Sequence, residues 1–361
     1  MESNDAQKRY QITGQNGFIS CIMSCNVTAT DTDDSRKAAC VHRCQAAQTG
    51  FETHDIDSHL RTPSPFDTSE LPDTSGIDPG LTSYLKRNIQ REIDRRNAVL
   101  TLLTSPVINA REYTYLHNVP DLCQRSETII LFVIPSALTN FGKRARVRSN
   151  NYARFVKDTQ NKAKMAFFVG MVPASFNDTY RYQVQKRIDM EFAQFGDIIQ
   201  ADYEDEYSNM WYKTQSVLKW VTSYCGSVQY VIRTDDDIQI HTHRVLAALF
   251  FAEGHHDHFV MGVRRRNSKP QRIDTGKWYI SLEEYPEEFF PPFVIGGLVG
   301  LPGRTAKLLY EASRRVSKIW LDDVYFTGIL THKLNLPVLS DPDFTFAHFP
   351  KGNKRRVPQT F

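Results

Sequence analysis

The sequence predicts an α/β protein with a mainly parallel, doubly wound sheet. The first observation is that, after Cys123, short apolar runs alternate with segments whose apolar residues recur at helical spacing. The second is size and composition, since 361 residues, of which 41% are apolar, can fill a large core. The third is that this region shows no internal repeat of about 20 to 50 residues.

The expected elements alternate between strand and helix along this region. The runs IILFVI and MAFFV are apolar throughout, as strands buried on both faces are. One helix is marked by residues spaced i, i+3, i+4 and i+7, namely Thr214, Val217, Leu218 and Val221. The expected strands are 129–134, 165–169, 228–233 and 258–261, and the expected helices include 214–221 and 245–251.

Composition divides the chain into five expected parts. Residues 53–80 are rich in Pro, Ser, Thr and Asp and nearly free of periodic apolar residues, which indicates a flexible linker. Leu85, Ile89 and Ile93 lie near helical spacing, so 81–103 is expected to be an amphipathic helix, either a connector or a surface helix packed on the next domain. The parts are 1–52 (a twin CxxxC helical segment), 53–80 (the linker), 81–120 (a connecting helix and loop), 121–350 (the main domain) and 351–361 (a basic tail).

Four cysteines near the amino terminus form two CxxxC pairs, Cys21 with Cys25 and Cys40 with Cys44. In helices each pair would lie one turn apart on one face, so a helical hairpin could close two disulfides. The pattern resembles small helical hairpins of the intermembrane space over this short segment. Zinc ligation and unpaired thiols are the alternatives, although zinc ligands more often come as CxxC. Disulfides here would indicate an oxidising compartment.

Charge and hydropathy give no indication of a nucleic-acid partner or of a membrane-spanning helix. The net charge of +3 is too small to indicate a nucleic-acid partner, and we expect none. No apolar run approaches the roughly 18 residues of a membrane-spanning helix, and the amino terminus lacks the apolar core of a signal peptide. We therefore expect a soluble chain with no visible anchor or export signal.

The strongest local signal is an apolar strand that ends in three acidic residues, Asp235, Asp236 and Asp237. Adjacent carboxylates repel one another, so a folded chain places them in solvent or around a cation. At the carboxyl end of a strand they lie where open α/β sheets bind ligands. Their oxygen atoms favour Mn²⁺ or Mg²⁺, which could bridge a ligand's diphosphate, whereas a solvated acidic turn is the alternative.

Five ordered segments carry a family resemblance: DLCQRSETIILFVIPSALTNFGKRARVRSN, GDIIQADYEDEYSNMWYKTQSVLKW, YCGSVQYVIRTDDDIQI, GKWYISLEEYPEEFFPPFVIGG and LDDVYFTGIL. Over residues 123–339 the chain resembles the β1,3-galactosyltransferase family, glycosyltransferase family 31. The resemblance implies a GT-A-like (Rossmann-like) fold, with a mixed, mainly parallel sheet flanked by helices and a small N-terminal helical segment outside the resemblance. It also implies a UDP-sugar donor, Mn²⁺ or Mg²⁺, a glycan acceptor on a glycoprotein or glycolipid, and inversion at the anomeric carbon.

The resemblance assigns the metal ligands and one donor contact. Asp235 and Asp237 match the ends of the family's DxD motif and would hold the metal, which offsets charge on the departing UDP. Asp236 would meet the donor's ribose or sugar. His348, in the segment FTFAHFP, lies where related enzymes supply a metal-binding histidine, and a core or surface histidine is the alternative.

Basic residues complete the expected donor site. Arg144 and Arg148 match the family's RxxxR segment and would either pair with the diphosphate or hold the donor loop, unless they are surface charges on a helix. Lys213 and Thr214 match the family's Lys-Thr pair, or simply pack their helix.

The second acidic motif, LDDVYFTG, matches the family's Glu-Asp-Val-Tyr block. Inversion by single displacement needs one carboxylate to take the proton of the acceptor hydroxyl, and Asp323 is the expected base. Asp322, which replaces Glu, would be a neighbour or a charge at a helix N-terminus, and both could instead cap the helix starting near Val324. Residues expected to shape the donor and acceptor pockets are Trp278, Tyr285, Gly296 and Gly297.

The chain also departs from the family pattern. Ser149-Asn150 replaces Thr-Trp, and Leu298-Val299 replaces Gly-Tyr after the two glycines. We expect an inverting, metal-dependent transferase that moves galactose or N-acetylhexosamine from a UDP-sugar to a glycan in β1,3 linkage. A catalytically impaired relative that binds carbohydrate or nucleotide is the alternative.

The family implies the Golgi lumen and membrane association, although this sequence shows no anchor. Two Asn-x-Ser/Thr sequons, at Asn26 and Asn177, would suit a lumenal protein and are candidate glycosylation sites.

Overall fold

The computed structural model describes residues 79–124 and 126–349 of the chain. Eight strands form one sheet in the order β1-β4-β3-β2-β5-β8-β7-β9, and β6 pairs separately with β10. The central strands β4, β3, β2 and β5 are parallel, whereas β8 runs antiparallel to both of its neighbours. The strands are β1 (Tyr115–His117), β2 (Ile130–Pro135), β3 (Ala163–Met171), β4 (Ile198–Glu204), β5 (Tyr230–Thr234), β6 (Ile238–Ile240), β7 (Val260–Arg265), β8 (Phe293–Pro302), β9 (Val338–Leu339) and β10 (Phe346–His348).

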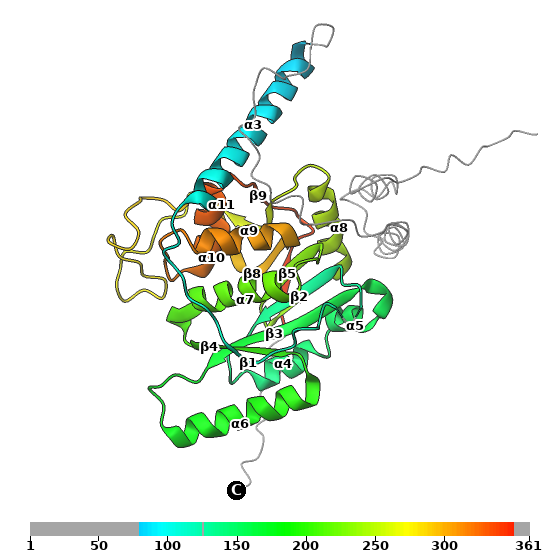
Figure 1. Ribbon diagram of the computed structural model, residues 1–361, viewed down its shortest axis with the longest axis vertical. Coiled ribbons are helices and arrows are strands. Elements are labelled where there is room, and N and C mark those ends of the chain that lie inside the picture. The colour runs from blue at the N-terminus through cyan, green and yellow to red at the C-terminus, as the bar shows by residue number, and fades with distance from the viewer. Residues whose placement is uncertain (1–78, 125, 350–361) are drawn as a thin grey trace, which may run out of the picture.

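Helices cover both faces of this sheet (Figure 1). The α-helices are α3 (Pro79–Thr104), α4 (Phe141–Val147), α5 (Asn151–Lys157), α6 (Asp178–Phe195), α7 (Met210–Tyr224), α8 (Thr242–Glu253), α9 (Gly303–Ser313), α10 (Asp322–Val324) and α11 (Leu330–Lys333). Shorter turns are η3 (Thr159–Asn161), η4 (Tyr207–Asn209) and the π-helical η5 (Tyr325–Ile329). The predicted α/β class, with a mixed, mainly parallel sheet flanked by helices, is confirmed.

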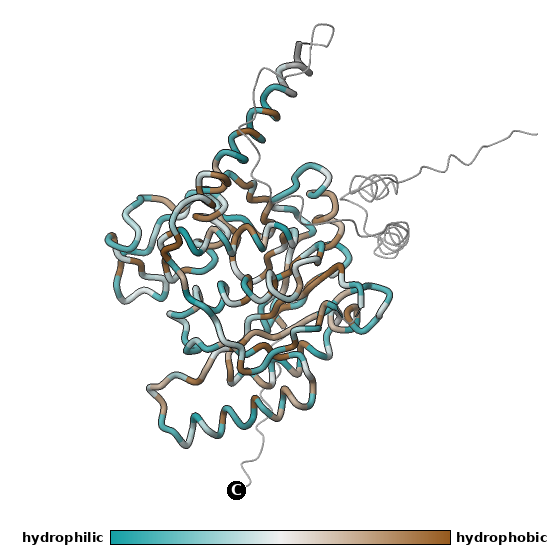
Figure 2. Tube along the Cα trace, in the orientation of Figure 1, coloured by the Kyte–Doolittle hydropathy of each residue, from teal (hydrophilic) through white to brown (hydrophobic). Residues whose placement is uncertain are grey.

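Side-chain alternation along the strands builds two separate cores. In β2, Leu131 and Val133 pack with α7 and α9, whereas Phe132 and Ile134 point to the opposite face, toward α5 and α8. All six residues of β2 are buried, which explains why the strand is apolar throughout. Figure 2 shows the sheet as a continuous apolar band between more polar helices.

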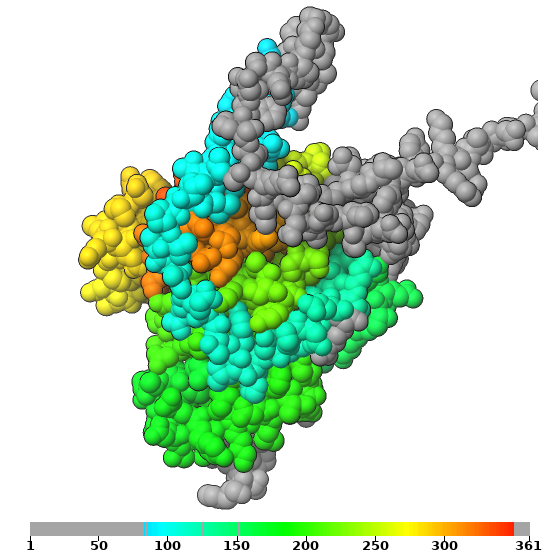
Figure 3. Space-filling view, in the orientation of Figure 1, coloured from blue at the N-terminus to red at the C-terminus, as the bar shows by residue number. Residues whose placement is uncertain are grey.

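The predicted amphipathic helix is observed as α3. Its C-terminal part packs on the core through Val99, Leu102 and Leu103, and the rest of the helix projects away from the body (Figures 1 and 3). No helix among residues 79–124 and 126–349 is long and apolar enough to cross a membrane.

A disulfide that the sequence analysis missed joins Cys123, ahead of β2, to Cys225, at the end of α7. Both cysteines are buried. A disulfide of this kind is typical of a chain that folds in an oxidising compartment. The four cysteines of the twin CxxxC segment lie outside the described residues, as do Asn26, the expected linker 53–80 and the expected tail 351–361.

The strands and helices predicted within the described residues are observed, with ends shifted by a few residues, whereas the helices predicted for the twin CxxxC segment lie outside those residues. The most important strand that the sequence analysis missed is β8, whose sequence FVIGGLVGLP reads as a glycine-rich loop. Its glycines admit close neighbours: a Cβ on Gly296 would lie 2.6 Å from the Arg233 guanidinium, and one on Gly297 would lie 2.6 Å from the Phe346 ring. β8 therefore needs glycine because other side chains press against it.

Candidate active site

The acidic triplet lies at the carboxyl end of β5, beside the carboxyl end of the parallel strand β2. This is the edge where open α/β sheets bind ligands. Asp236 is 5% exposed and accepts hydrogen bonds from Ser136 Oγ (2.7 Å) and Asn140 Nδ2 (2.8 Å), both in the loop that follows β2. Asp235 and Asp237 flank it and keep 42% and 40% of their side chains exposed. The two outer carboxylates are therefore the accessible ones, and the contacts of Asp236 favour holding the loop over touching the donor.

The structure brings His348 to the triplet. β10 pairs with β6 so that His348 lies opposite Ile238, and His348 Nδ1 is 3.6 Å from Asp237 Oδ1. Lys143 Nζ lies 3.0 Å from Asp237 Oδ2 and 3.3 Å from Asp236 Oδ1. Within the described part of the chain, no three histidine, cysteine or acidic side chains converge closely enough to hold an ion. Lys143 offsets the charge of Asp236 and Asp237, and Arg233 lies near Asp235.

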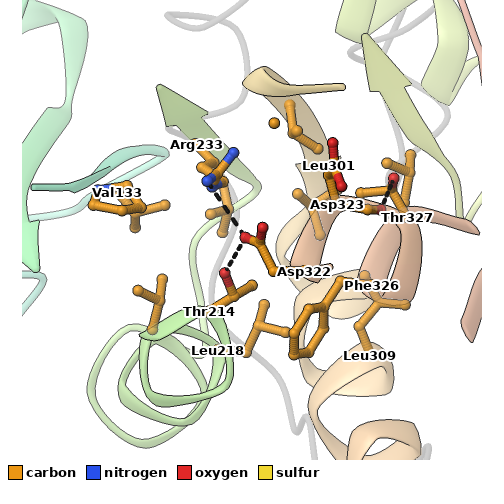
Figure 4. Close-up of a pocket in the computed structure, with 16 residues that line it drawn as sticks. Val133, Thr214, Leu218, Arg233, Leu301, Leu309, Asp322, Asp323, Phe326 and Thr327 are labelled. Carbon is orange, nitrogen blue, oxygen red and sulfur yellow. Dashed lines mark hydrogen bonds and ion pairs between the residues drawn. The ribbon is translucent and has the colours of Figure 1, made fainter. Parts of the chain in front are cut away.

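The second acidic motif forms α10, and Figure 4 shows Asp322 pointing toward Arg233 and Thr214. Arg233 Nη2 lies 3.5 Å from Asp322 Oδ2 and 3.7 Å from Asp235 Oδ1. Asp322 also accepts a hydrogen bond from Thr214 Oγ1 (2.7 Å) on α7. A small pocket lies among these side chains, and Gly296 and Asp323 line it together with apolar residues of the sheet, α7 and η5.

Asp323 has an unusual electrostatic environment. Burial raises its pKa to about 6, and the neighbouring Asp322 carboxylate adds to the increase. Its Oδ1 accepts a hydrogen bond from the Val324 amide (2.8 Å), and the Gly296 amide also stabilises the charged form. The N-cap residue of α10 is Leu321, and no side chain caps this helix end. The contacts therefore do not support the capping role that the sequence left open for Asp322 and Asp323.

The first motif lies in a similar environment, because the surrounding protein raises the pKa of Asp235 to about 6 even though 42% of its side chain reaches solvent. The Arg233 guanidinium opposes this increase, and the Asp322 carboxylate adds to it. The two acidic motifs thus share one electrostatic environment. We infer that a change in charge at either motif affects protonation at the other.

Arg144 is fully buried and organises the loop after β2. Its guanidinium donates to the Ala137 and Leu138 carbonyl oxygens (2.8 and 3.0 Å), and it forms an ion pair with Glu191 of α6 (2.6 Å). Arg148 pairs with the same glutamate. The surface-charge interpretation of Arg144 is wrong, because this side chain is 0% exposed, and its contacts favour the loop-holding role that the sequence analysis considered.

Lys213 supports the same loop from the other side. Its ammonium group is buried, pairs with Asp205 (2.5 Å) and donates to the Ser136 carbonyl oxygen (2.9 Å). Two of the three predicted donor-site cations, Arg144 and Lys213, therefore position the loop that holds Asp236. Any contact with a donor would be made by that loop rather than by these two charges.

The predicted pocket residues take different places. Gly296 lines the pocket, and Gly297 accepts the backbone hydrogen bond of Asp235 (3.0 Å). Trp278 lies on the surface with 54% of the residue exposed. Tyr285 is half-buried and donates its hydroxyl to the Phe289 carbonyl oxygen (3.0 Å), so it packs the segment between β7 and β8.

Sequence reasoning missed several residues of this site. Arg233 carried a usable signal, because a basic residue at the end of an apolar strand directly precedes the acidic triplet. Lys143 carried none, since it stands among other basic residues of α4. Glu191 and Asp205, the partners of the buried cations, gave no signal that distinguished them from surface acids.

A family model described as galactosyltransferase matches residues 144–342, which is more than half of the chain and includes both acidic motifs. The chain belongs to the galactosyltransferase family. His348 and Lys143 lie just outside the matched residues of this galactosyltransferase family member.

Named relatives agree with this membership. A lactosylceramide 1,3-N-acetyl-beta-D-glucosaminyltransferase of Xenopus tropicalis is 29% identical over 70% of this chain and 67% of its own length. The human beta-1,3-galactosyltransferase 5 is 30% identical over 64% of this chain and 71% of its own length. Among solved structures, a mannosyltransferase from Pyrobaculum calidifontis in complex with GDP-Man and Mn²⁺ aligns with 73% of this chain and 68% of its own, at 14% identity and a TM-score of 0.35.

Proposed function

We propose that this member of the galactosyltransferase family is an inverting, metal-dependent enzyme that transfers galactose or an N-acetylhexosamine from a UDP-sugar to a glycan in β1,3 linkage. The observation that carries the proposal is the meeting of the two acidic motifs on either side of Arg233. One motif offers exposed carboxylates for a metal and diphosphate, and the other offers a carboxylate with a raised pKa for proton transfer. The glycan acceptor would be part of a glycoprotein or glycolipid, and the Golgi lumen is the compartment that we propose.

The chemistry assigns one task to each motif. The acceptor hydroxyl oxygen forms a bond to the anomeric carbon while the bond from that carbon to the UDP oxygen breaks, and UDP leaves with the electron pair. Asp323 takes the proton of the attacking hydroxyl. Its raised pKa suits this step, because a base that holds a proton near neutral pH accepts one more readily than an ordinary carboxylate.

Asp235, Asp237 and His348 are the residues that would hold Mn²⁺, with Mg²⁺ as the alternative. Two carboxylates and an imidazole suit these ions, and Asp237 Oδ1 lies 3.6 Å from His348 Nδ1, but the three side chains would have to draw closer together to share one ion. The metal would offset the charge that develops on UDP. The Lys143 side chain is 42% exposed. It can therefore move away from the triplet when a divalent cation neutralises the carboxylates instead.

The loop after β2 would carry the donor, with Arg144 and Lys213 fixing its position and Asp236 tying it to the triplet. Arg148 would act through Glu191, the carboxylate that it shares with Arg144. Gly296, Gly297 and Asp322 would shape the site between donor and acceptor. Trp278 and Tyr285 belong to the acceptor side.

The departures from the family pattern favour activity over a purely binding role. Asn150 accepts a hydrogen bond from the Ala153 amide and so caps α5. Leu298 and Val299 are buried in β8. These positions serve packing, and both acidic motifs are retained.

The test is UDP release by the full chain from a panel of UDP-sugars with Mn²⁺ and a glycan acceptor, together with UDP binding. We expect Asp237→Ala to abolish Mn²⁺-dependent UDP binding, because the diphosphate loses its bridging cation. Asp178→Ala, which removes a carboxylate that is 98% exposed on α6, is the matched control and should bind normally. Equal UDP affinity of Asp237→Ala and the parent would exclude the metal assignment, and UDP binding without transfer from any sugar would favour the impaired relative.

A further inference from the structure

Lys143 is a cation whose charge partners both belong to the acidic triplet. Its Nζ atom lies 3.0 Å from Asp237 Oδ2 and 3.3 Å from Asp236 Oδ1. Lys143 follows Asn140 by three residues, and Asn140 donates a hydrogen bond to the other oxygen of Asp236 (2.8 Å). This hydrogen bond ties the loop after β2 to the triplet, so it also keeps the backbone of Lys143 close to these carboxylates.

The neighbouring cations are held differently. Arg144 is 0% exposed and pairs with Glu191, and Lys213 is buried and pairs with Asp205. The Lys143 side chain is 42% exposed, and within the described part of the chain it forms no ion pair outside the triplet. To move Arg144 or Lys213 would leave buried charges unpaired, which is costly, whereas Lys143 can move into solvent. Lys143 is therefore a cation of this site that can change its partner.

The contacts of Lys143 compete with the proposed metal. Lys143 engages Asp237 Oδ2, while Asp237 Oδ1 lies 3.6 Å from His348 Nδ1. A divalent cation on Asp237 would repel the ammonium group beside it, so binding of the metal alone has to break both ion pairs of Lys143. The site without nucleotide therefore binds a metal less tightly than the same carboxylates would without Lys143.

A diphosphate would offer Lys143 a new partner at the same place. Bonds from such an ion to oxygen are about 2 Å long, so a phosphate oxygen that shares an ion with Asp237 lies within about 4 Å of the carboxylate oxygen. Lys143 Nζ already lies 3.0 Å from Asp237 Oδ2, and rotation of its long side chain can bring it to that phosphate. A hydrogen bond between an ammonium group and a phosphate is charge-assisted and strong. The nucleotide thus replaces the ion pairs that the metal breaks.

We propose that Lys143 couples metal binding to nucleotide binding: it opposes the metal in the empty site and pairs with the diphosphate when both ligands are present. Each ligand then raises the affinity for the other by the same factor, as linkage requires. The site takes up the metal and UDP as a unit and releases the metal readily once UDP has left. This inference rests on the proposed function, because that proposal places the metal on Asp237.

The test is Lys143→Met in the full chain, which keeps a long side chain and removes its charge. Mn²⁺ affinity is measured by electron paramagnetic resonance with and without UDP, and UDP affinity by calorimetry at saturating Mn²⁺. We expect Mn²⁺ alone to bind more tightly to the variant and UDP to bind less tightly. The factor by which UDP raises Mn²⁺ affinity should fall by roughly fivefold or more, the lower end of ordinary coupling between two sites.

Lys186→Met is the matched control, because it makes the same change of charge at an exposed position of α6. Both affinities of this variant should equal those of the parent. Circular dichroism melts of both variants check that each is folded at the temperature of the binding measurements.

The opposite signs of the two changes are the decisive result. If Lys143 only held the triplet in shape, its removal would weaken the binding of Mn²⁺ and UDP together. Weaker binding of both ligands, unchanged binding of both, or tighter Mn²⁺ binding with unchanged UDP affinity would each overturn the coupling while leaving the metal assignment intact. If the parent binds no Mn²⁺ even with UDP present, the metal dependence in the proposed function fails, and the coupling fails with it.

Discussion

Asp323→Asn isolates the proposed proton transfer, because the substitution keeps the shape of the side chain and removes its ability to take a proton. A base that acts only while the hydroxyl attacks contributes to the transition state more than to the ground state. We therefore expect UDP and Mn²⁺ affinity to stay near the parental values. The single-turnover transfer rate should fall by roughly 10²–10⁴-fold, the usual contribution of a general base.

The stability of this variant should change in an unusual direction. Burial raises the pKa of Asp323 from 3.8 to about 6, so the charged form is disfavoured in the folded state. Stability from this group is fully present below its unfolded pKa and is lost as pH rises through about 6. A shift of about two units corresponds to at most about 3 kcal/mol. Asparagine avoids this cost and can still accept the Val324 hydrogen bond. We expect the variant to be as stable as the parent or more stable above pH 6, with the difference gone near pH 4.

The pH dependence of the parent's transfer rate is a second test of the Asp323 carboxylate. With a pKa of about 6, the ionised fraction of Asp323 falls from about nine-tenths at pH 7 to about one-tenth at pH 5. The transfer rate of the parent should fall with it by about tenfold. At Mn²⁺ and UDP-sugar concentrations that saturate the site at both pH values, so that protonation of Asp235 does not limit donor binding, the residual rate of the asparagine variant should lack this dependence.

Thermal melts at several pH values, combined with single-turnover rates, distinguish a general base at Asp323 from a helix cap. A lost helix cap would instead lower the free energy of unfolding by about 1 kcal/mol and leave turnover per folded molecule unchanged. A variant that is destabilised yet transfers sugar at the parental rate would refute the reasoning. The proton acceptor would then have to be sought elsewhere, with Asp322 the next candidate.

The remaining predictions concern buried charge, the disulfide and glycosylation. Glu191→Gln leaves two buried guanidinium groups without their shared carboxylate, so urea unfolding should show a loss of about 3–5 kcal/mol; a loss below about 1 kcal/mol would contradict this role. Cys225→Ser opens a disulfide that links residues 102 positions apart and should cost about 2–5 kcal/mol, and an unchanged melting temperature would count against the bond. Expressed through a secretory pathway, the chain should carry a glycosidase-sensitive glycan on Asn177, whose Oδ1 accepts the helix-capping hydrogen bond and leaves Nδ2 for attachment. Thr179→Ala should remove the glycan while keeping the cap, and persistence of that mass would exclude the site.

The sequence predicted the strands that are apolar on both faces, because such runs have few other structural explanations. β2, β3 and β5 lie where their composition placed them, and the triplet after β5 lies at the expected edge of the sheet. β8 could not be found in this way. Its glycines are required by the Arg233 and Phe346 side chains that press on it, and those neighbours come from other parts of the chain.

The roles of the basic residues were harder to predict, because charge alone does not tell whether a side chain is buried. Arg144 stands in a run of basic residues, and its partner Glu191 follows 47 residues later on α6. Only the fold shows that they meet beneath the loop after β2. The contact between His348 and Asp237 likewise depends on the pairing of β10 with β6, which two very short strands do not reveal in sequence.

Gly296 and Gly297, two of the three glycines of β8, set the mutational tolerance of the site. Gly296 leaves room for Arg233, which faces both acidic motifs, and Gly297 leaves room for Phe346, which shares β10 with His348. A methyl group at the first position would displace the guanidinium between the motifs, and one at the second would displace the strand that carries the histidine. Two neighbouring positions without side chains of their own thus act as spacers for separate parts of the site. Substitution is restricted at these positions because the side chains of Arg233 and Phe346 need the space, and not because the glycines take part in the reaction.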